Sequence, residues 1–214
     1  MKINIIADTH CQHGAITVPE CDILIHAGDA CAHGNEQELR SFAIWFNNQT
    51  QAKTRLYIPG NHDRFVESYP DIAKLMFTDG SKLLLDELVE VDGLRIFGTP
   101  WTPELCNWAF QGDDTGGMKR GFRDLERHFG LLPDCDVLVC HGPAFGIQDK
   151  TDMGDRVGSV FLLKAIHRIK PKLFACGHVH KQRGVWSDGT TKFVNACICD
   201  ENYQPTRTPI EVIL

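Results

Sequence analysis

Residues that can bind metal ions or transfer protons follow several short apolar segments of this sequence. The most informative stretch is Gly60-Asn61-His62-Asp63, which comes directly after the apolar run 55–59. A glycine lets the backbone turn sharply there, so that an asparagine and a histidine are presented side by side where a predicted strand ends. Such a tetrapeptide is also ordinary turn material, and its meaning depends on whether other strands end in the same way.

Four other predicted strands end in residues of the same kind. The blocks are Asp8-Thr9-His10, Gly28-Asp29, His141-Gly142 and Gly177-His178-Val179-His180. The carboxyl ends of parallel strands meet at one edge of a sheet, so we expect two aspartates, one asparagine and up to five histidines to lie within a few ångströms. Any single block is more often a helix cap or a satisfied turn residue. The recurrence at five strand ends is what indicates a site.

The chemistry of such a cluster requires cations, because buried carboxylates without partners are costly. Mixed carboxylate, amide and imidazole ligands suit borderline divalent ions, and we expect two of them: manganese first, with iron, cobalt, nickel or zinc as alternatives. Two ions about 3.5–4 Å apart promote in-line displacement at phosphorus. A hydroxide bridging them would attack, and the ions would neutralise the phosphoryl oxygens. The residues therefore predict a dinuclear phosphoesterase.

The elements that position these blocks alternate between buried strands and amphipathic helices. Strands are predicted at 2–7, 22–27, 55–59, 136–140 and 172–176. Asn35 and Glu38 form a capping-box pattern ahead of a helix, whose apolar residues recur at helical spacing: Leu39, Phe42, Ala43 and Phe46. Ser159 is the expected N-cap of a helix over 160–169. This order favours an α/β fold with parallel strands and helices outside.

The remaining segments are shorter. A short helix is predicted after Pro70, a helix over 122–129, a rigid loop over 98–103 and a mobile glycine-rich loop over 111–121. Short strands are predicted at 83–85, 88–91, 94–97, 183–186, 192–195 and 209–213, with Asp92-Gly93 as a hairpin turn. Because no repeat or linker interrupts the chain, we expect a single domain over 1–214.

Composition narrows the function classes. The chain has 214 residues, of which 43% are hydrophobic and 23% charged, with a net charge of -6. This balance gives no basic surface for nucleic acid or an anionic membrane. It is compatible with a small phosphoester, the expected partner, because the local charge of metal ions can outweigh the net charge of the chain. Nine cysteines without a C-x-x-C pair indicate free thiols in a reducing cytoplasm. A signal peptide and a long apolar span are not expected; the oligomeric state stays open.

The five blocks, in this order, resemble the signature of the calcineurin-like metallophosphoesterases: D-x-H, G-D, G-N-H-D/E, H-G and G-H-x-H. The similarity covers nearly the whole chain and extends to the metallophosphoesterase domain-containing branch of that family. The further matching segments are His26-Ala27-Gly28-Asp29, 98–103, His141-Gly142-Pro143, Asp149, Asn195-Ala196 and Gln204-Pro205-Thr206. The resemblance implies a four-layer α/β/β/α sandwich with the site at the sheet edges.

Roles follow from the resemblance, position by position. Asp8, His10 and His180 would hold the first ion, Asn61, His141 and His178 the second, and Asp29 would bridge the two. His62 would stand beside the phosphate and protonate the leaving oxygen or stabilise the developing charge, and Asp63 would orient His62 or cap the next helix. Some members of the branch carry glycine in place of His178. Since the histidine is present here, we expect two well-filled sites, which metal analysis can test.

The expected substrate is a small phosphodiester, including 2′,3′- or 3′,5′-cyclic nucleotides. Protein serine/threonine phosphatases of the superfamily carry arginine in G-D-x-x-D-R-G, whereas residues 28–34 contain none, so a phosphoprotein is not expected. A phosphomonoesterase or broad-specificity phosphatase is the first alternative, and a non-catalytic metal-binding scaffold the second. Five residues could line the pocket or be solvated loop residues: Trp101, Lys119, Arg120, Lys150 and Arg156.

Overall fold

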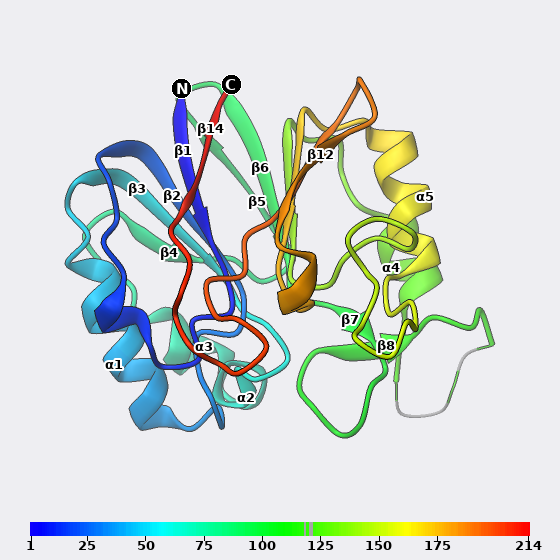
Figure 1. The fold of residues 1–214 in the computed structure, drawn as a ribbon, viewed down its shortest axis with the longest axis horizontal. Helices are drawn as coiled ribbons and strands as arrows, with labels where there is room; N and C mark the ends of the chain where they lie inside the picture. Colours follow the sequence, from blue (N-terminus) through cyan, green and yellow to red (C-terminus); the bar gives the residue numbers. More distant parts are fainter. Residues whose placement is uncertain (118, 120–121) are drawn as a thin grey trace.

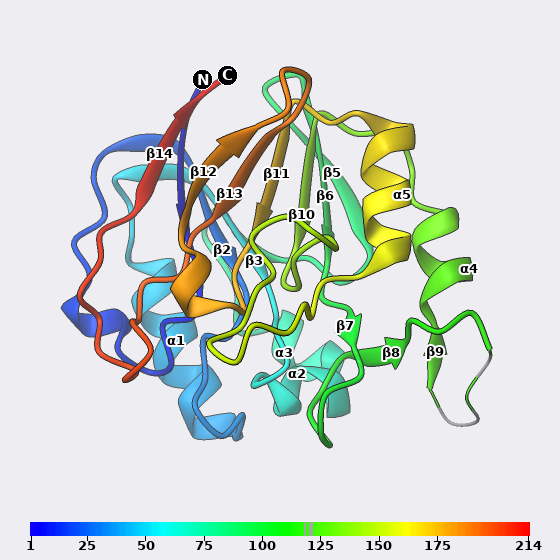
Figure 2. The same ribbon diagram turned by 45° about the vertical axis from the view of Figure 1, so that its right-hand side comes forward.

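The computed structural model describes residues 1–117, 119 and 122–214. In this part of the chain, two sheets pack face to face and helices cover their outer faces (Figures 1 and 2). The first sheet has the order β14 (Ile210–Ile213), β1 (Lys2–Ile6), β2 (Cys21–Ala27), β3 (Ala52–Ile58) and β4 (Ser81–Leu83). The second has the order β12 (Gly184–Ser187), β13 (Lys192–Asn195), β11 (Leu173–Cys176), β10 (Val137–Cys140), β6 (Leu94–Thr99) and β5 (Glu87–Val91). The four-layer prediction is confirmed.

The other elements surround these two sheets. A small third sheet contains β7 (Thr102–Pro103), β8 (Gln111–Asp113) and β9 (Arg123–Asp124). The helices are α1 (Glu36–Asn47), α2 (Arg64–Ser68), α3 (Pro70–Lys74), α4 (Leu125–Gly130) and α5 (Val160–Ile169), with 3₁₀ turns at His13–Ala15 and His180–Gln182. Figure 1 shows α1 and α3 beside the first sheet, α4 and α5 beside the second, and the two termini side by side.

Parallel pairing dominates both large sheets. In the first, β1 to β4 are parallel neighbours and only β14 runs antiparallel. In the second, β6, β10, β11 and β13 are parallel, and antiparallel strands β5 and β12 form the edges. The carboxyl ends of the central strands of each sheet therefore lie at one end of that sheet.

The core follows from the alternation of side chains along each strand. Ile3, Ile5 and Val139 belong to the cluster between the two sheets, whereas the alternate residues Ile6 and Leu138 belong to the clusters that face helices. Successive strand residues point to opposite faces, so a strand covered on both sides must be apolar throughout. This explains why the strands read as continuous apolar runs.

Helix α1 begins with a variant of the predicted capping box. The Asn35 side chain accepts the N–H of Glu38 at 3.0 Å, as expected. The Glu38 carboxylate does not return to the N–H of Asn35, as a capping box requires; it accepts the N–H groups of Ala32, His33 and Gly34 instead. Glu38 thereby fixes the loop that follows β2, which carries Asp29.

The apolar face of α1 is predicted to carry much of its stability. Phe42 is fully buried, and its ring lies 4.8 Å from Tyr57 and 5.2 Å from Phe46. We expect Phe42→Ala to lower the free energy of unfolding by about 3–5 kcal/mol, because it leaves a cavity. Ile44→Ala, at a side chain that is 64% exposed, should change it by about 0.5 kcal/mol or less. Urea unfolding measures both, and equal losses would contradict the assignment of the buried face.

Three local predictions were wrong. The helix expected over 122–129 begins only at Leu125, because the Asp124 carboxylate caps it by accepting the N–H of Arg127 and the residues before it pair as β9. The loop expected over 98–103 continues β6 and then forms β7. The strand expected at 83–85 lies at Ser81–Leu83.

The glycine-rich segment 111–121 also differs from the prediction of a mobile loop at its start. It opens as β8, which is buried, and the Asp113 carboxylate then accepts the N–H groups of Thr115 and Lys119. Residues 118, 120 and 121, including Arg120, lie outside the described residues. All nine cysteines are unpaired, as expected. Among the described residues, no helix has the length and apolar character that crossing a bilayer requires.

Candidate metal centre

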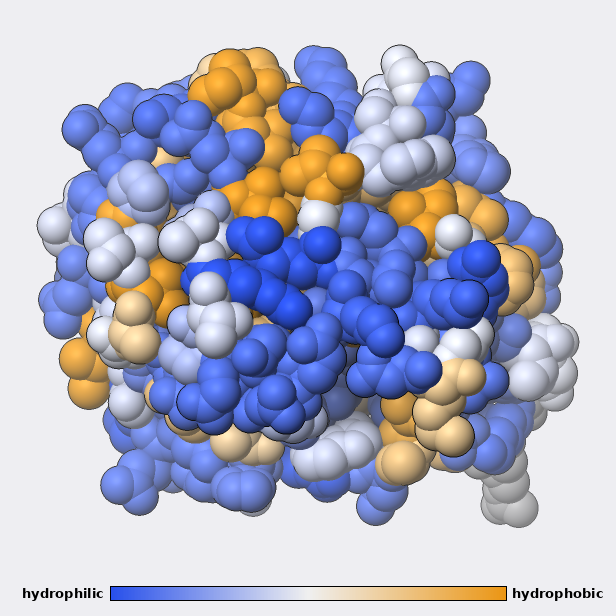
Figure 3. Space-filling view, in the orientation of Figure 1, coloured by the Kyte–Doolittle hydropathy of each residue, from blue (hydrophilic) through white to orange (hydrophobic). Residues whose placement is uncertain are grey.

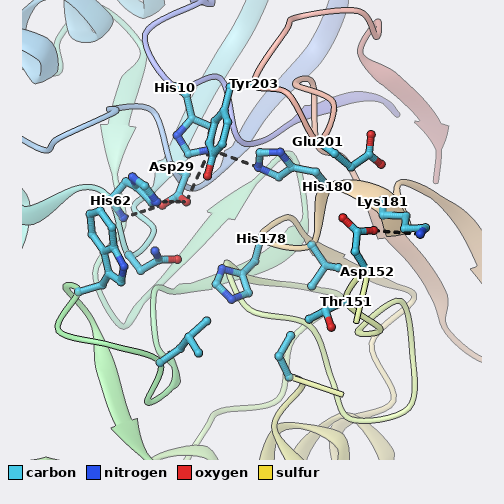
Figure 4. Close-up of a pocket in the computed structure, with 15 residues that line it drawn as sticks. His10, Asp29, His62, Thr151, Asp152, His178, His180, Lys181, Glu201 and Tyr203 are labelled. Carbon is cyan, nitrogen blue, oxygen red and sulfur yellow. Dashed lines mark hydrogen bonds and ion pairs between the residues drawn. The ribbon is translucent and has the colours of Figure 1, made fainter. Parts of the chain in front are cut away.

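The predicted blocks meet between the two large sheets. Asp8 follows β1, Asp29 follows β2 and Asn61 follows β3, all in the first sheet. His141 follows β10 and His178 follows β11, both in the second. The convergence is therefore built across two packed sheets rather than along the edge of one. Figure 4 shows His10, His62, His178 and His180 around Asp29 in this space.

One cluster contains Asp8, His10 and His180. The Nε2 atom of His180 lies 3.4 Å from Asp8 Oδ1 and 3.3 Å from His10 Nε2. Ligand atoms of the three residues all lie within 4.8 Å of one another. The set predicted for the first ion is thus brought together, with residues from both sheets.

A second cluster contains Asp29, His141 and His178, whose ligand atoms also lie within 4.8 Å of one another. Asn61 Oδ1 lies 3.0 Å from His141 Nε2. Asp29 Oδ2 lies 3.4 Å from His141 Nε2 and 3.9 Å from His10 Nε2. Asp29 therefore stands between the two clusters, where a bridging carboxylate would stand.

The hydrogen bonds behind the histidines show that the clusters fit divalent cations. The Nδ1 atoms of His10, His141 and His180 face the backbone carbonyls of Cys31, Ala27 and Asp200 at 3.2, 2.9 and 2.8 Å. A carbonyl only accepts, so each Nδ1 donates a proton to it, and each ring in its neutral form would offer its Nε2 lone pair to a bound ion. Separations of 3.3–3.4 Å between donor atoms match two ligands bound about 2.1 Å from one ion.

Comparison with known proteins identifies the family. The sequence model of the calcineurin-like phosphoesterases matches residues 1–182. The chain belongs to this family. The human and mouse metallophosphoesterase domain-containing protein 1 are each 34% identical, over 98% of this chain and 69% of the relative. A UPF0046 protein of Caenorhabditis elegans is 35% identical, over 98% of this chain and 74% of the relative.

Solved structures agree on the fold. The crystal structure of TT1561 of Thermus thermophilus has a TM-score of 0.60 at 12% identity and covers 91% of this chain and 88% of that one. Membership of the calcineurin-like phosphoesterases supports a metal-dependent phosphoester hydrolase with a dinuclear divalent centre.

Charge in this phosphoesterase site is arranged to favour cations. Burial raises the pKa of Asp8, but a hydrogen bond from His180 and the charge of His141 outweigh it, so the pKa lies well below the ordinary value. Burial also raises the pKa of Asp29, and His141 more than offsets this. Burial lowers the pKa of His141 and His180, yet the two aspartates raise each to about 9. The centre thus holds ionised carboxylates and attracts positive charge.

Four of the seven candidate ligands have left-handed backbone conformations. The φ angles are 52° at Asp8, 39° at His10, 57° at Asp29 and 70° at His178. Each such residue costs about 1–3 kcal/mol unless its surroundings enforce it, and such residues cluster at functional sites. Here the enforcement includes the Asp8 carboxylate, which accepts the N–H of His178 at 3.0 Å.

Glycines in the predicted blocks make room for the ligands of neighbouring blocks. A Cβ on Gly177 would overlap the Asp8 carboxylate, one on Gly60 would overlap Asp29, and one on Gly28 would overlap the ring of His141. Glycine is thus needed at these positions because a ligand of another block occupies the space that a side chain would fill. The sequence alone does not show this contact between blocks.

Gly177→Ala is therefore expected to weaken metal binding and the fold together. Its Cβ would also lie 2.7 Å from the Cβ of Ala7, and overpacking of this kind costs about 1–3 kcal/mol. We expect fewer retained ions after desalting, measured by elemental analysis, and a lower Tm. Gly14→Ala is the matched control, since a Cβ there meets nothing within 4 Å. A Gly177→Ala protein with unchanged Tm and metal content would contradict the overlap.

The carboxylate of Asp63 does neither of the two things that the sequence suggested. It accepts the N–H groups of Asp29, Cys31 and Gly60 at 2.9, 3.0 and 2.7 Å, so it joins two loops of the site. Asp63 occupies the N-cap position of α2 without a side-chain cap bond. The ring of His62 is oriented by the Ala32 carbonyl instead, which accepts from Nδ1 at 2.7 Å.

A cavity of about 360 Å³ opens above the two clusters. His62 lines it, with Nε2 4.0 Å from Asp29 Oδ2. Two further lining residues, Trp108 and Tyr203, are not predicted from the sequence, because they lie in irregular loops outside the blocks. The Tyr203 ring lies 4.8 Å from His10 and 5.2 Å from His180. Figure 3 shows that this face of the molecule is largely hydrophilic across its middle.

Most of the residues predicted as pocket candidates are engaged elsewhere. The Trp101 N–H donates to Asp86 at 3.0 Å, and Lys119 pairs with Glu104. Lys150 is exposed and its backbone bridges to Arg156. Arg156 pairs with Asp149 at 2.6 Å and lines a neighbouring cavity together with His178.

Proposed function

We propose that this protein is a phosphodiesterase that hydrolyses small diesters, including 2′,3′- or 3′,5′-cyclic nucleotides. The observation that carries the proposal is the position of Asp29 between two ligand clusters at the base of the cavity. With manganese or another divalent ion in both clusters, the centre would activate water as the nucleophile and neutralise charge on the phosphoryl group. Asp8, His10 and His180 would hold one ion, and Asn61, His141 and His178 the other.

The charges around the cavity favour a diester over a more highly charged substrate. Among the described lining residues, the cationic side chain of Lys181 is paired with Asp152 at 2.9 Å, and Glu201 adds another acidic group. A diester carries one negative charge, which the metal centre can neutralise, so its binding requires no additional cationic side chain. Segment 28–34 likewise contains no arginine that could clamp a dianion.

His62 is proposed to act as the general acid that protonates the leaving oxygen. Because Nδ1 donates to the Ala32 carbonyl, Nε2 is the nitrogen that faces the substrate, and in the imidazolium form it carries a proton. As the P–O bond breaks, the leaving oxygen would take this proton, and a positioned acid typically contributes 10²–10⁴-fold. Asp63 contributes through the loops that it joins rather than through the ring of His62.

One observation favours the alternative of a phosphomonoesterase. Arg156 lines the neighbouring cavity with His178, and its guanidinium, which pairs with Asp149 at 2.6 Å, could also contact a second negative charge on a substrate that reached it. The proposal is tested with purified protein loaded with Mn²⁺ and assayed on bis(4-nitrophenyl) phosphate, both classes of cyclic nucleotide and 4-nitrophenyl phosphate. Diester turnover that chelation abolishes is expected. Turnover of the monoester alone would establish the alternative, and no turnover with any divalent ion would indicate a metal-binding scaffold.

A further inference from the structure

The indole of Trp108 stacks on the imidazole of His62. The two ring centroids lie 4.1 Å apart and the planes are 26° from parallel. His10 contacts the same imidazole edge-on, with centroids 4.8 Å apart and planes at 81°. The ring of His62 is therefore covered by an aromatic surface on one side and fixed by a hydrogen bond from its Nδ1 to Ala32.

The loop that carries Trp108 is tied to the segment that carries His62. The N–H of Ala109 donates to the carbonyl of Asn61 at 3.0 Å, and the N–H of Phe110 donates to the Glu67 carboxylate at 2.7 Å. The Arg64 guanidinium donates to the carbonyl of Asn107 and lies 4.7 Å from the Trp108 ring centroid. These contacts link the loop after β7 to the turn after β3 and set the height of the indole over the imidazole.

We propose that Trp108 is a positioning residue that holds the His62 ring in the orientation that delivers a proton to the leaving oxygen. One hydrogen bond at Nδ1 leaves the ring free to tilt about the bond axis, whereas a stacked indole removes that freedom. Offset-stacked aromatic pairs contribute about 0.5–1.5 kcal/mol beyond their buried area. The inference rests on the proposed role of His62, and Trp108 itself transfers nothing.

The decisive comparison varies the leaving group. The full chain, loaded with Mn²⁺, is assayed on methyl phenyl phosphate, whose leaving oxygen needs a proton, and on methyl 4-nitrophenyl phosphate, whose leaving oxygen does not. For Trp108→Leu we expect kcat for the phenyl ester to fall about tenfold or more, within the range of general acid catalysis, and kcat for the nitrophenyl ester to fall about threefold or less. Trp108→Phe should recover most of the loss. Equal losses on both esters, or none, would overturn the proposal.

Two further measurements distinguish a loss of His62 positioning in Trp108→Leu from a general folding defect. Trp186→Leu, at a 48% exposed tryptophan on β12, should match the wild type on both esters. In a His62→Ala background, Trp108→Leu should cause no additional leaving-group dependence, because residues that act through one another are not additive. If Trp108→Leu still lowers kcat for the phenyl ester more than for the nitrophenyl ester when His62 is absent, Trp108 acts through another residue and the proposal fails.

The stack can be tested even if the wild type hydrolyses no diester, an outcome that would defeat the proposed function alone. In the zinc-loaded protein, the ring protons of His62 are identified by NMR from their absence in His62→Ala. A stacked indole shields them, so Trp108→Leu should move them downfield and Trp186→Leu should not. Unchanged resonances would show that Trp108 does not hold the ring.

Discussion

Asp29→Asn is expected to lower kcat/KM for a phosphodiester by about 10³-fold or more and to reduce the metal content below two ions per chain. Asp29 is the residue whose carboxylate stands between both clusters, 3.4 Å from His141 and 3.9 Å from His10. An amide keeps the shape and the acceptor for the N–H of His62, which Asp29 Oδ1 binds at 2.8 Å. It removes the negative charge, however, and metal-ion catalysis is worth several kcal/mol, or about three orders of magnitude.

The measurement combines elemental analysis of the desalted protein with steady-state kinetics at saturating Mn²⁺. Glu211→Gln is a suitable control, because it makes the same kind of change, carboxylate to amide, at an exposed residue of β14 that pairs with Lys2 of β1. Near-wild-type activity with two retained ions in Asp29→Asn would rule out a bridging role. Loss of activity with unchanged metal content would instead place the contribution of Asp29 in positioning His62.

His62→Ala is expected to lower kcat by about 10²–10⁴-fold on substrates with poor leaving groups, the usual range for a positioned acid, while both ions are retained. The structure leaves one competing role, since a ligand atom of His62 lies within 4.8 Å of those of His10 and Asp29. Elemental analysis separates the two: an acid can be removed without losing metal, whereas a ligand cannot. His167→Ala, at an exposed position of α5, is the control.

The leaving-group dependence gives a second criterion for His62. A 4-nitrophenyl ester departs without a proton, so its hydrolysis should be much less sensitive to the substitution than that of a phenyl ester. Equal losses on both esters would mean that His62 stabilises charge on the phosphoryl group rather than protonating the leaving oxygen. The loss of one ion together with activity would move His62 into the ligand set.

The candidate metal ligands could be predicted from the sequence, because their positions depend on residues close to them in the chain. Each candidate ligand lies within the four residues that follow a buried strand, so its approximate position depends on where the strand ends, as at Asp8 and His141. The four layers required the family resemblance, because an apolar strand reads the same whether a helix or a second sheet covers it. The assignment of β10 and β11 to a different sheet from β1 is therefore not visible in the strands themselves.

The parts that were missed depend on partners distant in sequence. The sequence predicts that Asp63 orients its neighbour His62 or caps the next helix, yet its carboxylate accepts the backbone N–H groups of Asp29 and Cys31, more than thirty positions earlier. The sequence predicts helix where β9 forms, because the local preference does not show the pairing with β8 that outweighs it. Trp108 lies in a loop without periodicity, whose place is defined by contacts with Asn61, Arg64 and Glu67.

The origin of the ligands in both sheets has a mechanical consequence. Asp8 and His10 come from one half of the sandwich and His180 from the other, and Asp29 faces His141 across the same divide. Each bound cation would therefore cross-link the two sheets at the end of the sandwich where the strands terminate. Ligands that bind only the folded state stabilise it by mass action. The free energy of unfolding would therefore depend on the concentration of free metal ions, and depletion of metal would weaken the packing of the two sheets as well as abolish activity.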